Sequence, residues 1–267
     1  GLGITQLDVS KNTKLEKLNL HYTNVSTLDL SKNTKLKWID FGLSSYTSPS
    51  TDPITQIDFS NNLELEHIAC DAIVRTVDMD GHLINDKVGL SKIDVTMLPH
   101  LKFLNFNGNS IKDIDLSKNI ELTQLNCSRN YLKELDITNN HKLDRLICEL
   151  NQLAELDLSN SHSLTYLNCA YNQIGKLDIS KTIMSHLLAN NNQITSFSLG
   201  EKVFDTPEGK DNKPYLYLKL NDNKIPSIDV SKQVNLAWLE INNNELTGLD
   251  ISNCPYLGGV LLNNNKV

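Results

Sequence analysis

The stretch "LTQLNCSRNYLKELDITNNHK" (residues 122–142) is one complete unit of a pattern that runs through the chain. Within it, Leu125 and Cys127 alternate with Asn126, and this period of two predicts a short β-strand. The second part, "LKELDITNN", repeats the same spacing, so the unit divides into pieces of 10 and 11 residues. A unit this small cannot bury its own apolar edge, and successive units must therefore stack on one another.

The repeat continues from one end of the chain to the other. When the chain is aligned on L-x-x-L-x-L-x-x-N-x-L, seven of the ten intervals between unit starts are 20 or 21 residues, and the others are 29, 36 and 31. Each longer interval is one period of 21 residues plus an insertion. The unit starts are Leu15, Leu36, Leu65, Leu101, Leu122, Leu143, Leu164, Met184, Tyr215, Leu236 and Leu257.

The second half of each unit has the form L-x-x-L-D-h-S-x-N-x-x, as in "VSTLDLSKNTKL", "IKDIDLSKNIEL" and "LTGLDISNCPYL". Together the two halves resemble the leucine-rich-repeat family, and within it the nested 21-residue bacterial class called IRREKO-type. The resemblance covers essentially the whole chain outside the insertions. It implies an extracellular or effector-type bacterial protein that works by binding other molecules.

We therefore predict a β-rich leucine-rich-repeat solenoid of right-handed coils of about 21 residues, with a parallel sheet on its concave face and little or no helix. Residues 1–267 should form a single domain of about 11 repeats, with loop insertions near 42–53, 71–89 and 200–214. Strands about 4.8 Å apart give an arc on the order of 50 Å. The back of so short a coil should hold extended or 3₁₀ segments.

Two polar columns are expected to satisfy the turns between these strands. The asparagines that close the strand segment should form a side-chain ladder that bonds to turn backbone groups; they are Asn24, Asn109, Asn130, Asn151, Asn172, Asn192, Asn223, Asn244 and Asn265. We expect the aspartates of the second half, together with the Ser or Thr that follows, to hydrogen-bond the turn backbone. The alternative is a calcium-binding edge, but calcium needs six to eight oxygens per ion, and the sequence does not supply them. These aspartates are Asp8, Asp29, Asp58, Asp94, Asp115, Asp136, Asp157, Asp178, Asp229 and Asp250.

Four cysteines recur at one position of the unit, namely Cys70, Cys127, Cys148 and Cys169. Even spacing is compatible with a metal site, a disulfide or the core. The position faces inward, and stacked Cβ atoms nearly 5 Å apart exceed the 3.5–4.5 Å that a disulfide prefers, by the spacing of strands. Zinc would need four convergent ligands, and no histidine occupies a neighbouring inward position. We therefore predict core packing.

Composition and motifs exclude several classes of function. A net charge of −7 argues against nucleic acid, which requires a basic face. No apolar run approaches the roughly 18 residues of a membrane span, and "GLGITQLDVS" does not resemble a signal peptide. Because no G-x-S-x-G, H-E-x-x-H, Walker or G-x-G-x-x-G motif occurs, we expect no enzymatic activity, cofactor or metal. The chain starts and ends within the pattern, so we expect a processed protein or a fragment.

The outward residues of the strands are the candidate binding residues. Two positions after each unit start, five of eleven residues are aromatic, against 6% in the whole chain. Exposed aromatic side chains on a rigid sheet are common anchors of binding surfaces, although they could instead only cover neighbouring strands. The predicted concave-face site comprises Trp38, Asp40, His67, Phe103, Asn105, Gln124, Asn126, Arg145, Tyr166, Asn168, His186, Tyr217, Lys219, Trp238 and Glu240.

These residues support two functional hypotheses. The first is a non-enzymatic recognition module, secreted or on the surface of a bacterium, that binds a protein partner as a monomer through the concave face and the inserted loops. The second is a carbohydrate-binding surface protein in which Trp38, Tyr217 or Trp238 stacks on sugar rings. Repeats alone do not separate an adhesin from an effector. An enzymatic function would require a further domain, such as a ligase or a protease.

Overall fold

The structure is a computed structural model of the chain, and it describes residues 1–267 except 1–3, 22, 24, 43–53, 73–88 and 201–214. Most of each predicted insertion, as well as Asn24, therefore lies outside the described residues. Among the described residues, no helix is long and apolar enough to cross a membrane.

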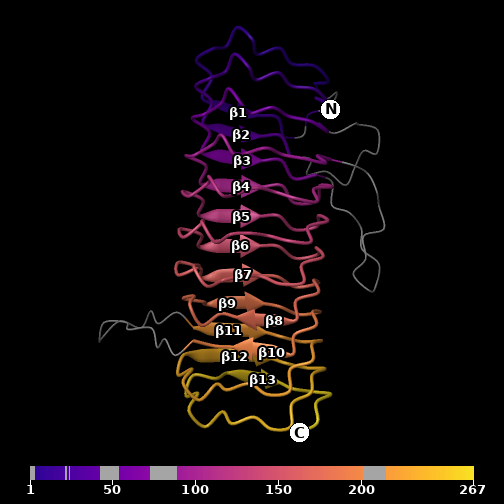
Figure 1. Ribbon diagram of the computed structural model, residues 1–267, viewed down its shortest axis with the longest axis vertical. Coiled ribbons are helices and arrows are strands. Elements are labelled where there is room, and N and C mark those ends of the chain that lie inside the picture. Colours follow the sequence, from indigo (N-terminus) through magenta and orange to yellow (C-terminus); the bar gives the residue numbers. More distant parts are fainter. Residues whose placement is uncertain (1–3, 22, 24, 43–53, 73–88, 201–214) are drawn as a thin grey trace, which may run out of the picture.

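The described residues form a solenoid in which parallel strands stack along the long axis (Figure 1). This confirms the predicted fold class. The main sheet has eleven strands, each in register with the next. They are β1 (Lys17–Asn19), β2 (Trp38–Asp40), β3 (His67–Ala69), β4 (Phe103–Asn105), β5 (Gln124–Asn126), β6 (Arg145–Ile147), β7 (Tyr166–Asn168), β9 (His186–Leu188), β11 (Leu216–Lys219), β12 (Leu236–Glu240) and β13 (Gly259–Leu261).

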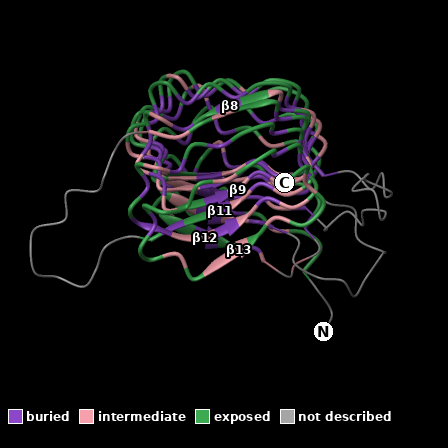
Figure 2. Cartoon of the chain, turned by 90° about the horizontal axis from the view of Figure 1, so that it is seen from below, coloured by how far each residue is buried: buried purple, intermediate pink, exposed green. Residues whose placement is uncertain are grey.

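A smaller sheet lies on the opposite side of the solenoid. It pairs β8 (Lys176–Asp178) with β10 (Ser196–Ser198) in parallel. Seen along the long axis, the main sheet and β8 lie on opposite sides of the coil, with buried residues between them (Figure 2). Extended segments on the back were therefore predicted correctly, whereas no 3₁₀ helix occurs in the part of the chain that the structure describes.

The core is a column of side chains from the middle of each strand and from the turns around it. Leu104, Leu125 and Leu146 come from successive strands, and each is at most 1% exposed. The adjacent inward position holds Cys127, Cys148 and Cys169, all fully buried and free. Burial raises the pKa of Cys127 and of Cys169 to about 12, so these thiols stay protonated. The core role predicted for these cysteines is confirmed.

One unit start was predicted wrongly. The start of the unit that contains β11 was placed at Tyr215, but Tyr215 is 41% exposed and Leu216 is buried at 3%. Leu216 pairs with Leu236, and a register shift follows before Tyr217 pairs with Trp238. The strand is therefore one residue out of phase with its neighbours at its start, because the buried position needs the leucine rather than the tyrosine.

The asparagine ladder is confirmed for all of its described members. Asn130, for example, donates through Nδ2 to the carbonyls of Phe106 (3.0 Å) and Cys127 (3.1 Å), and its Oδ1 accepts the N–H of Ile111 (3.0 Å). Each ladder residue thus links consecutive coils through groups that the core would otherwise leave unpaired. Bonds of the same kind recur at Asn109, Asn151, Asn172, Asn192, Asn223, Asn244 and Asn265.

The aspartate column acts as predicted. Asp115 Oδ1 accepts the N–H of Ser117 at 2.9 Å, and each of the other nine aspartates accepts the N–H two residues on. A second asparagine ladder, which was not among the predictions from the sequence, lies at the following turn. Asn119 and Asn140 donate through Nδ2 to carbonyls of the preceding coil, while their buried Oδ1 atoms have no partner in the described residues.

Candidate binding surface on the main sheet

The outward side of the main sheet, here called the sheet face, carries two columns of side chains. The alternation within each three-residue strand places the first and third residues outward and the second inward. The first column comprises Lys17, Trp38, His67, Phe103, Gln124, Arg145, Tyr166, His186, Tyr217, Trp238 and Gly259. The second comprises Asn19, Asp40, Ala69, Asn105, Asn126, Ile147, Asn168, Leu188, Lys219, Glu240 and Leu261.

The N-terminal part of the first column is a continuous stack. The Lys17 ammonium lies 4.2 Å from the centre of the Trp38 ring. The Trp38 ring stacks on His67 with centres 4.9 Å apart, and His67 stacks on Phe103 at 4.1 Å. Burial between the two rings, together with the charge of Lys17, lowers the pKa of His67, although the charge of Asp40 opposes the shift. The neutral imidazole is therefore favoured in this stack.

The C-terminal part repeats the same order of side-chain types. The Arg145 guanidinium lies 3.7 Å from the centre of the Tyr166 ring. His186 then stacks between Tyr166, at 6.1 Å, and Tyr217, at 4.8 Å. Each half of the column thus runs cation, aromatic ring, histidine, aromatic ring, and Gln124 separates the two halves.

Trp238 ends the aromatic part of the column and is fixed at two points. Its Nε1 donates to Glu240 Oε1 at 2.8 Å, and its ring lies where a Cβ on Gly259 would collide with it. Glu240 also accepts from Asn221 Nδ2 (3.0 Å) and pairs with Lys219 (3.1 Å). Burial raises the pKa of Glu240, but the three donors outweigh this effect and lower it overall.

Polar residues of the second column mainly cap the strand ends. Asn105 and Asn126 accept through Oδ1 the N–H two residues on, at 3.1 and 3.2 Å. Asn168 does the same to Ala170 (3.2 Å), donates to Glu149 (2.6 Å) and is only 7% exposed. The structure therefore places Asn168 largely out of reach of a partner, although its backbone position is the predicted one.

A further polar cluster lies beside β2 and β3. His21 Nδ1 is 3.2 Å from Asp40 Oδ1, and Asn105 Nδ2 is 3.4 Å from Asp71 Oδ1. Burial and the charge of Asp40 raise the pKa of Asp71. Among the described residues, no group of three or more His, Cys, Asp or Glu side chains could hold a metal ion.

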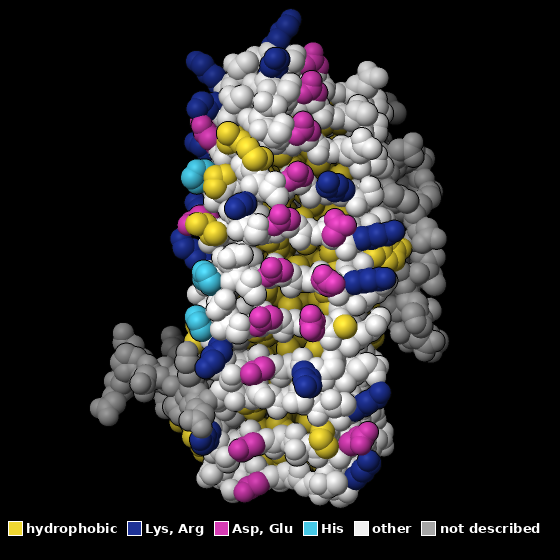
Figure 3. Space-filling view, in the orientation of Figure 1, with side chains coloured by type: hydrophobic (Ala, Val, Ile, Leu, Met, Phe, Trp, Pro, Cys, Tyr) yellow, Lys and Arg dark blue, Asp and Glu magenta, His cyan; other side chains and the backbone are white. Residues whose placement is uncertain are grey.

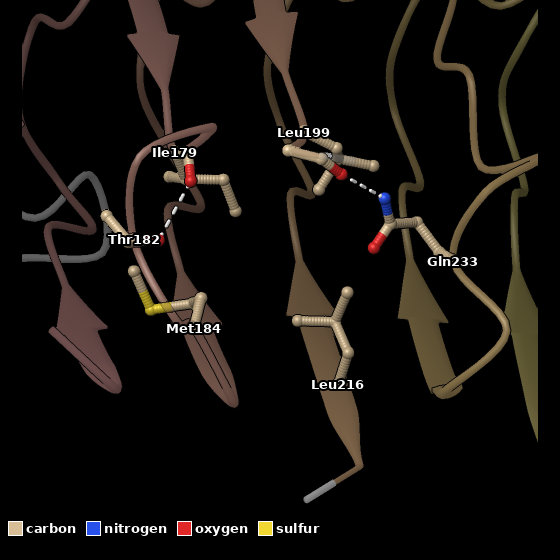
Figure 4. A pocket seen from close by; sticks show the side chains of 7 residues that line it. Ile179, Thr182, Met184, Leu199, Leu216 and Gln233 are labelled. Atoms are coloured by element: carbon tan, nitrogen blue, oxygen red, sulfur yellow. Dashed lines mark hydrogen bonds between the residues drawn. The ribbon is translucent and has the colours of Figure 1, made fainter. Parts of the chain in front are cut away.

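Other surfaces offer less for recognition. Acidic side chains recur in columns along the face seen in Figure 3, with apolar side chains between them; one shallow groove is lined by Glu134, Asp136, Glu155 and Asp157 over Leu135 and Leu156. A cavity of about 30 Å³ lies between Met184, Leu216 and Gln233 (Figure 4), where Gln233 Nε2 donates to the Gly200 carbonyl at 2.6 Å. That volume holds one or two waters and is too small for a substrate.

Part of this surface was absent from the predicted site. Ile147 and Leu188 add apolar area to the second column, and Lys17 extends the first column. Their positions follow from the same strand register, so the register alone could have identified them. The rotation of the rings onto one another could not be predicted from the sequence, because it depends on neighbours that are 20 to 36 residues away.

No protein-family model matches the sequence, and no curated protein matches it. Among solved structures, the internalin InlF from Listeria monocytogenes is 22% identical, with a TM-score of 0.63, and the match covers 96% of this chain and 76% of that one. The leucine-rich repeat domain of APL1B is 19% identical, with a TM-score of 0.60, over 79% of this chain and 62% of that one. The plant peptide hormone receptor RGFR1 in complex with RGF2 is 19% identical, with a TM-score of 0.71, over 96% and 41%.

The chain thus spans less than two thirds of the APL1B domain and of the receptor chain. At these identities the likeness concerns the fold. The repeat of about 21 residues, the continuous parallel sheet and the structural likeness to the APL1B domain make this chain a leucine-rich-repeat solenoid.

Proposed function

We propose that this solenoid is a non-enzymatic recognition module that binds a protein or peptide partner through its sheet face. The observation that carries the proposal is the first column, in which rings and cations line one side of a rigid sheet over consecutive strands. Aromatic and arginine side chains held in fixed positions are the usual anchors of protein interfaces. A stacked ring also loses little conformational entropy when a partner binds.

The solved relatives support a partner of this kind. RGFR1 is a peptide hormone receptor in complex with RGF2, and its fold is similar to that of this chain. InlF is a bacterial protein with the same general architecture. We extend the proposal accordingly to a monomeric, secreted or surface-exposed bacterial protein whose partner lies outside the cell.

The geometry gives less support to carbohydrate binding. A sugar stacks on the open face of an aromatic ring, but one face of Trp38 is covered by Lys17 and the other by His67. Trp238 is held over Gly259 by its bond to Glu240. The column therefore presents mainly ring edges and polar tips, which suit the mixed polar and apolar surface of a protein better than the apolar face of a sugar.

A library of random 12-residue peptides displayed on phage provides the test. Peptides selected on the immobilised chain should bind it, and Tyr166→Ala combined with Tyr217→Ala and Trp238→Ala should weaken that binding at least tenfold. Tyr171→Ala is the matched control, because Tyr171 belongs to the same coil as Tyr166 and is 41% exposed but lies outside both columns. Circular dichroism and thermal melting should show that all variants remain folded.

The two unfavourable outcomes are distinct. Selected peptides that bind the triple variant as well as the parent chain would overturn the sheet face as the binding surface. A library that yields no binder, together with retention of plant or bacterial polysaccharides that the triple variant loses, would overturn the protein partner in favour of carbohydrate.

A further inference from the structure

Arg145 occupies the centre of the sheet face. It begins β6 and pairs in register with Gln124 on one side and Tyr166 on the other. Its guanidinium lies over the Tyr166 ring, with 3.7 Å between Cζ and the ring centre. Stacking uses one face of the guanidinium plane and leaves the N–H groups at its edge directed away from the ring.

Those N–H groups have no acceptor among the described residues, because no side-chain hydrogen bond or ion pair joins Arg145 to any of them. Two other cations on or beside the sheet face are neutralised: Lys219 pairs with Glu240 at 3.1 Å, and Lys102 pairs with Glu66 at 2.6 Å. Lys17, the other stacked cation, lies on the terminal strand β1. Arg145 is thus a fixed cation in the middle of the surface, with its donors unused.

The surroundings of Arg145 favour an anion with an apolar neighbour. The outward residues of β5, β6 and β7 include no carboxylate, and Gln124 and Asn126 add amide groups next to the guanidinium. The nearby acids, Asp144 and Glu149, lie outside β6 and hydrogen-bond to Thr165 (2.5 Å) and Asn168 (2.6 Å). Arg145 is thus the one charged residue of β5, β6 and β7, on a chain whose net charge is −7.

We propose that Arg145 binds an Asp or Glu side chain of the partner, and that a neighbouring apolar residue of the same segment lies on Ile147, Leu188 and the Tyr166–His186–Tyr217 stack. This inference rests on the proposed function of the sheet face and names the partner class as an acidic, partly apolar peptide segment. A planar guanidinium forms two parallel hydrogen bonds with a carboxylate, and stacking on Tyr166 holds it ready to do so. One guanidinium matches a single carboxylate better than a doubly charged phosphate.

The same phage library tests this assignment. Binders that depend on the sheet face, identified by their loss on Tyr217→Ala, should be enriched in Asp or Glu at one position next to an apolar residue. Synthetic versions should lose at least tenfold in affinity when that acid becomes Asn or Gln. Arg145→Met should cause a similar loss, and combining both changes should add little, which is the signature of direct coupling. Arg145→Lys keeps the positive charge but cannot form the two parallel hydrogen bonds of a guanidinium, so it should recover only part of the affinity.

Lys112→Met is the matched control, because it removes one exposed cation from the second half of a coil, away from the main-sheet strands, and should leave affinity unchanged. Binders that lose affinity on Tyr217→Ala but show no acidic position, or that are indifferent to Arg145→Met, would overturn the role of Arg145 and leave the sheet-face proposal standing. Binders indifferent to Tyr217→Ala as well would overturn the proposed function itself.

Discussion

Asn130 shows how much one side chain does in a coil of 21 residues. It is 1% exposed, and its amide donates to the carbonyls of Phe106, Cys127 and Ser128 and accepts the N–H of Ile111. The Ser128 carbonyl also accepts the N–H of Gly108 at 3.0 Å, whereas the other three groups belong to turns where no backbone partner is available among the described residues. A buried backbone group left unpaired costs about 1–3 kcal/mol, so the ladder is required for a coil to stack on the next.

Replacing this residue should therefore destabilise the solenoid strongly. Asn130→Ala removes four hydrogen bonds and leaves buried groups unpaired, and we expect the free energy of unfolding to fall by about 3 kcal/mol. Urea unfolding followed by circular dichroism measures the change. Asn139→Ala, at an exposed position of the next half coil, is the control and should change stability by less than about 0.5 kcal/mol. Equal effects of the two substitutions would contradict the role of the ladder.

At the residue scale, repetition determined what could be predicted. The ladder of Asn130 and the turn bonds of Asp115 recur in nearly every coil, so a single pattern revealed both. The second ladder has the same regularity at Asn33, Asn62, Asn119 and Asn140 but gives way to Leu98, Ser161 and Thr182 in other coils, and its role was missed. The burial of Asn168 depends on Glu149 of the preceding coil, which the pattern of a single unit does not contain.

At the scale of the element, the turn after each strand sets the backbone geometry. The residue before the ladder asparagine has a positive φ in eight described coils: Gly108 (76°), Arg129 (54°), Leu150 (55°), Tyr171 (54°), Asn191 (55°), Asp222 (57°), Asn243 (55°) and Asn264 (56°). Asparagine and glycine tolerate this left-handed region, whereas leucine and tyrosine adopt it at a cost. In the C-terminal coils the side chains at this position also bond to one another, because Asn264 Nδ2 donates to Asn243 Oδ1 at 2.7 Å and Asn243 Nδ2 donates to Asp222 Oδ1 at 2.6 Å.

Tyr171 is therefore a position where substitution should stabilise the protein. Tyr171→Asn relieves the left-handed strain and brings an amide next to Asn191, and we expect a gain of about 0.5–1 kcal/mol. Differential scanning calorimetry should show a Tm higher by about 1–3 °C. Tyr171→Ala removes the same ring without adding an amide, so it should produce no gain. A lower Tm for the asparagine variant would show that the Tyr171 ring contributes more than the strain costs.

The register of the elements was only partly predictable. The period of 21 residues located every strand of the main sheet, because the inward leucines recur with it. The period placed the unit start wrongly at Tyr215. The insertion before β11 interrupts the count of 21 residues from the preceding unit, and Tyr215 and Leu216 both fit an apolar position. The pairing of β8 with β10 depends on bonds between coils, such as Thr195 N–H to the Gly175 carbonyl at 2.9 Å, which the pattern within a unit does not specify.

At the scale of the whole molecule, the aspartate column makes stability depend on acid. Hydrogen bonds from the hydroxyl and the N–H of the following Ser or Thr lower the pKa of eight of these carboxyls below the usual 3.8: Asp8, Asp29, Asp94, Asp115, Asp136, Asp157, Asp229 and Asp250. Because these pKa values are lower in the folded than in the unfolded chain, the unfolded chain binds more protons as the pH falls. The stability that the column contributes is thus present above pH 3.8 and lost as the pH drops through the folded-state pKa values.

Other titrating groups modify this profile without reversing it. The pKa of His67 is lowered from 6.5, so a further part of the stability is lost as the pH falls below that value. Burial raises the pKa of Asp71 above 3.8, so its contribution has the opposite sign: it is present below 3.8 and lost as the pH rises through the raised value. The single raised pKa of Asp71 acts against the eight lowered pKa values of the aspartate column. We therefore expect the Tm to fall progressively below pH 3.8.

Two triple variants separate the turn bonds from net charge. Asp115→Asn, Asp136→Asn and Asp157→Asn together remove three lowered pKa values from consecutive coils, so the fall in Tm between pH 5 and pH 2 should become shallower. Asp113→Asn, Glu134→Gln and Glu155→Gln remove the same charge from exposed positions of the same coils, where the described residues donate no turn hydrogen bond. This second triple should keep the steep acid profile of the parent chain. If both triples flatten the profile equally, repulsion along the acidic face rather than the turn bonds governs acid stability, and the aspartate column acts through its charge alone.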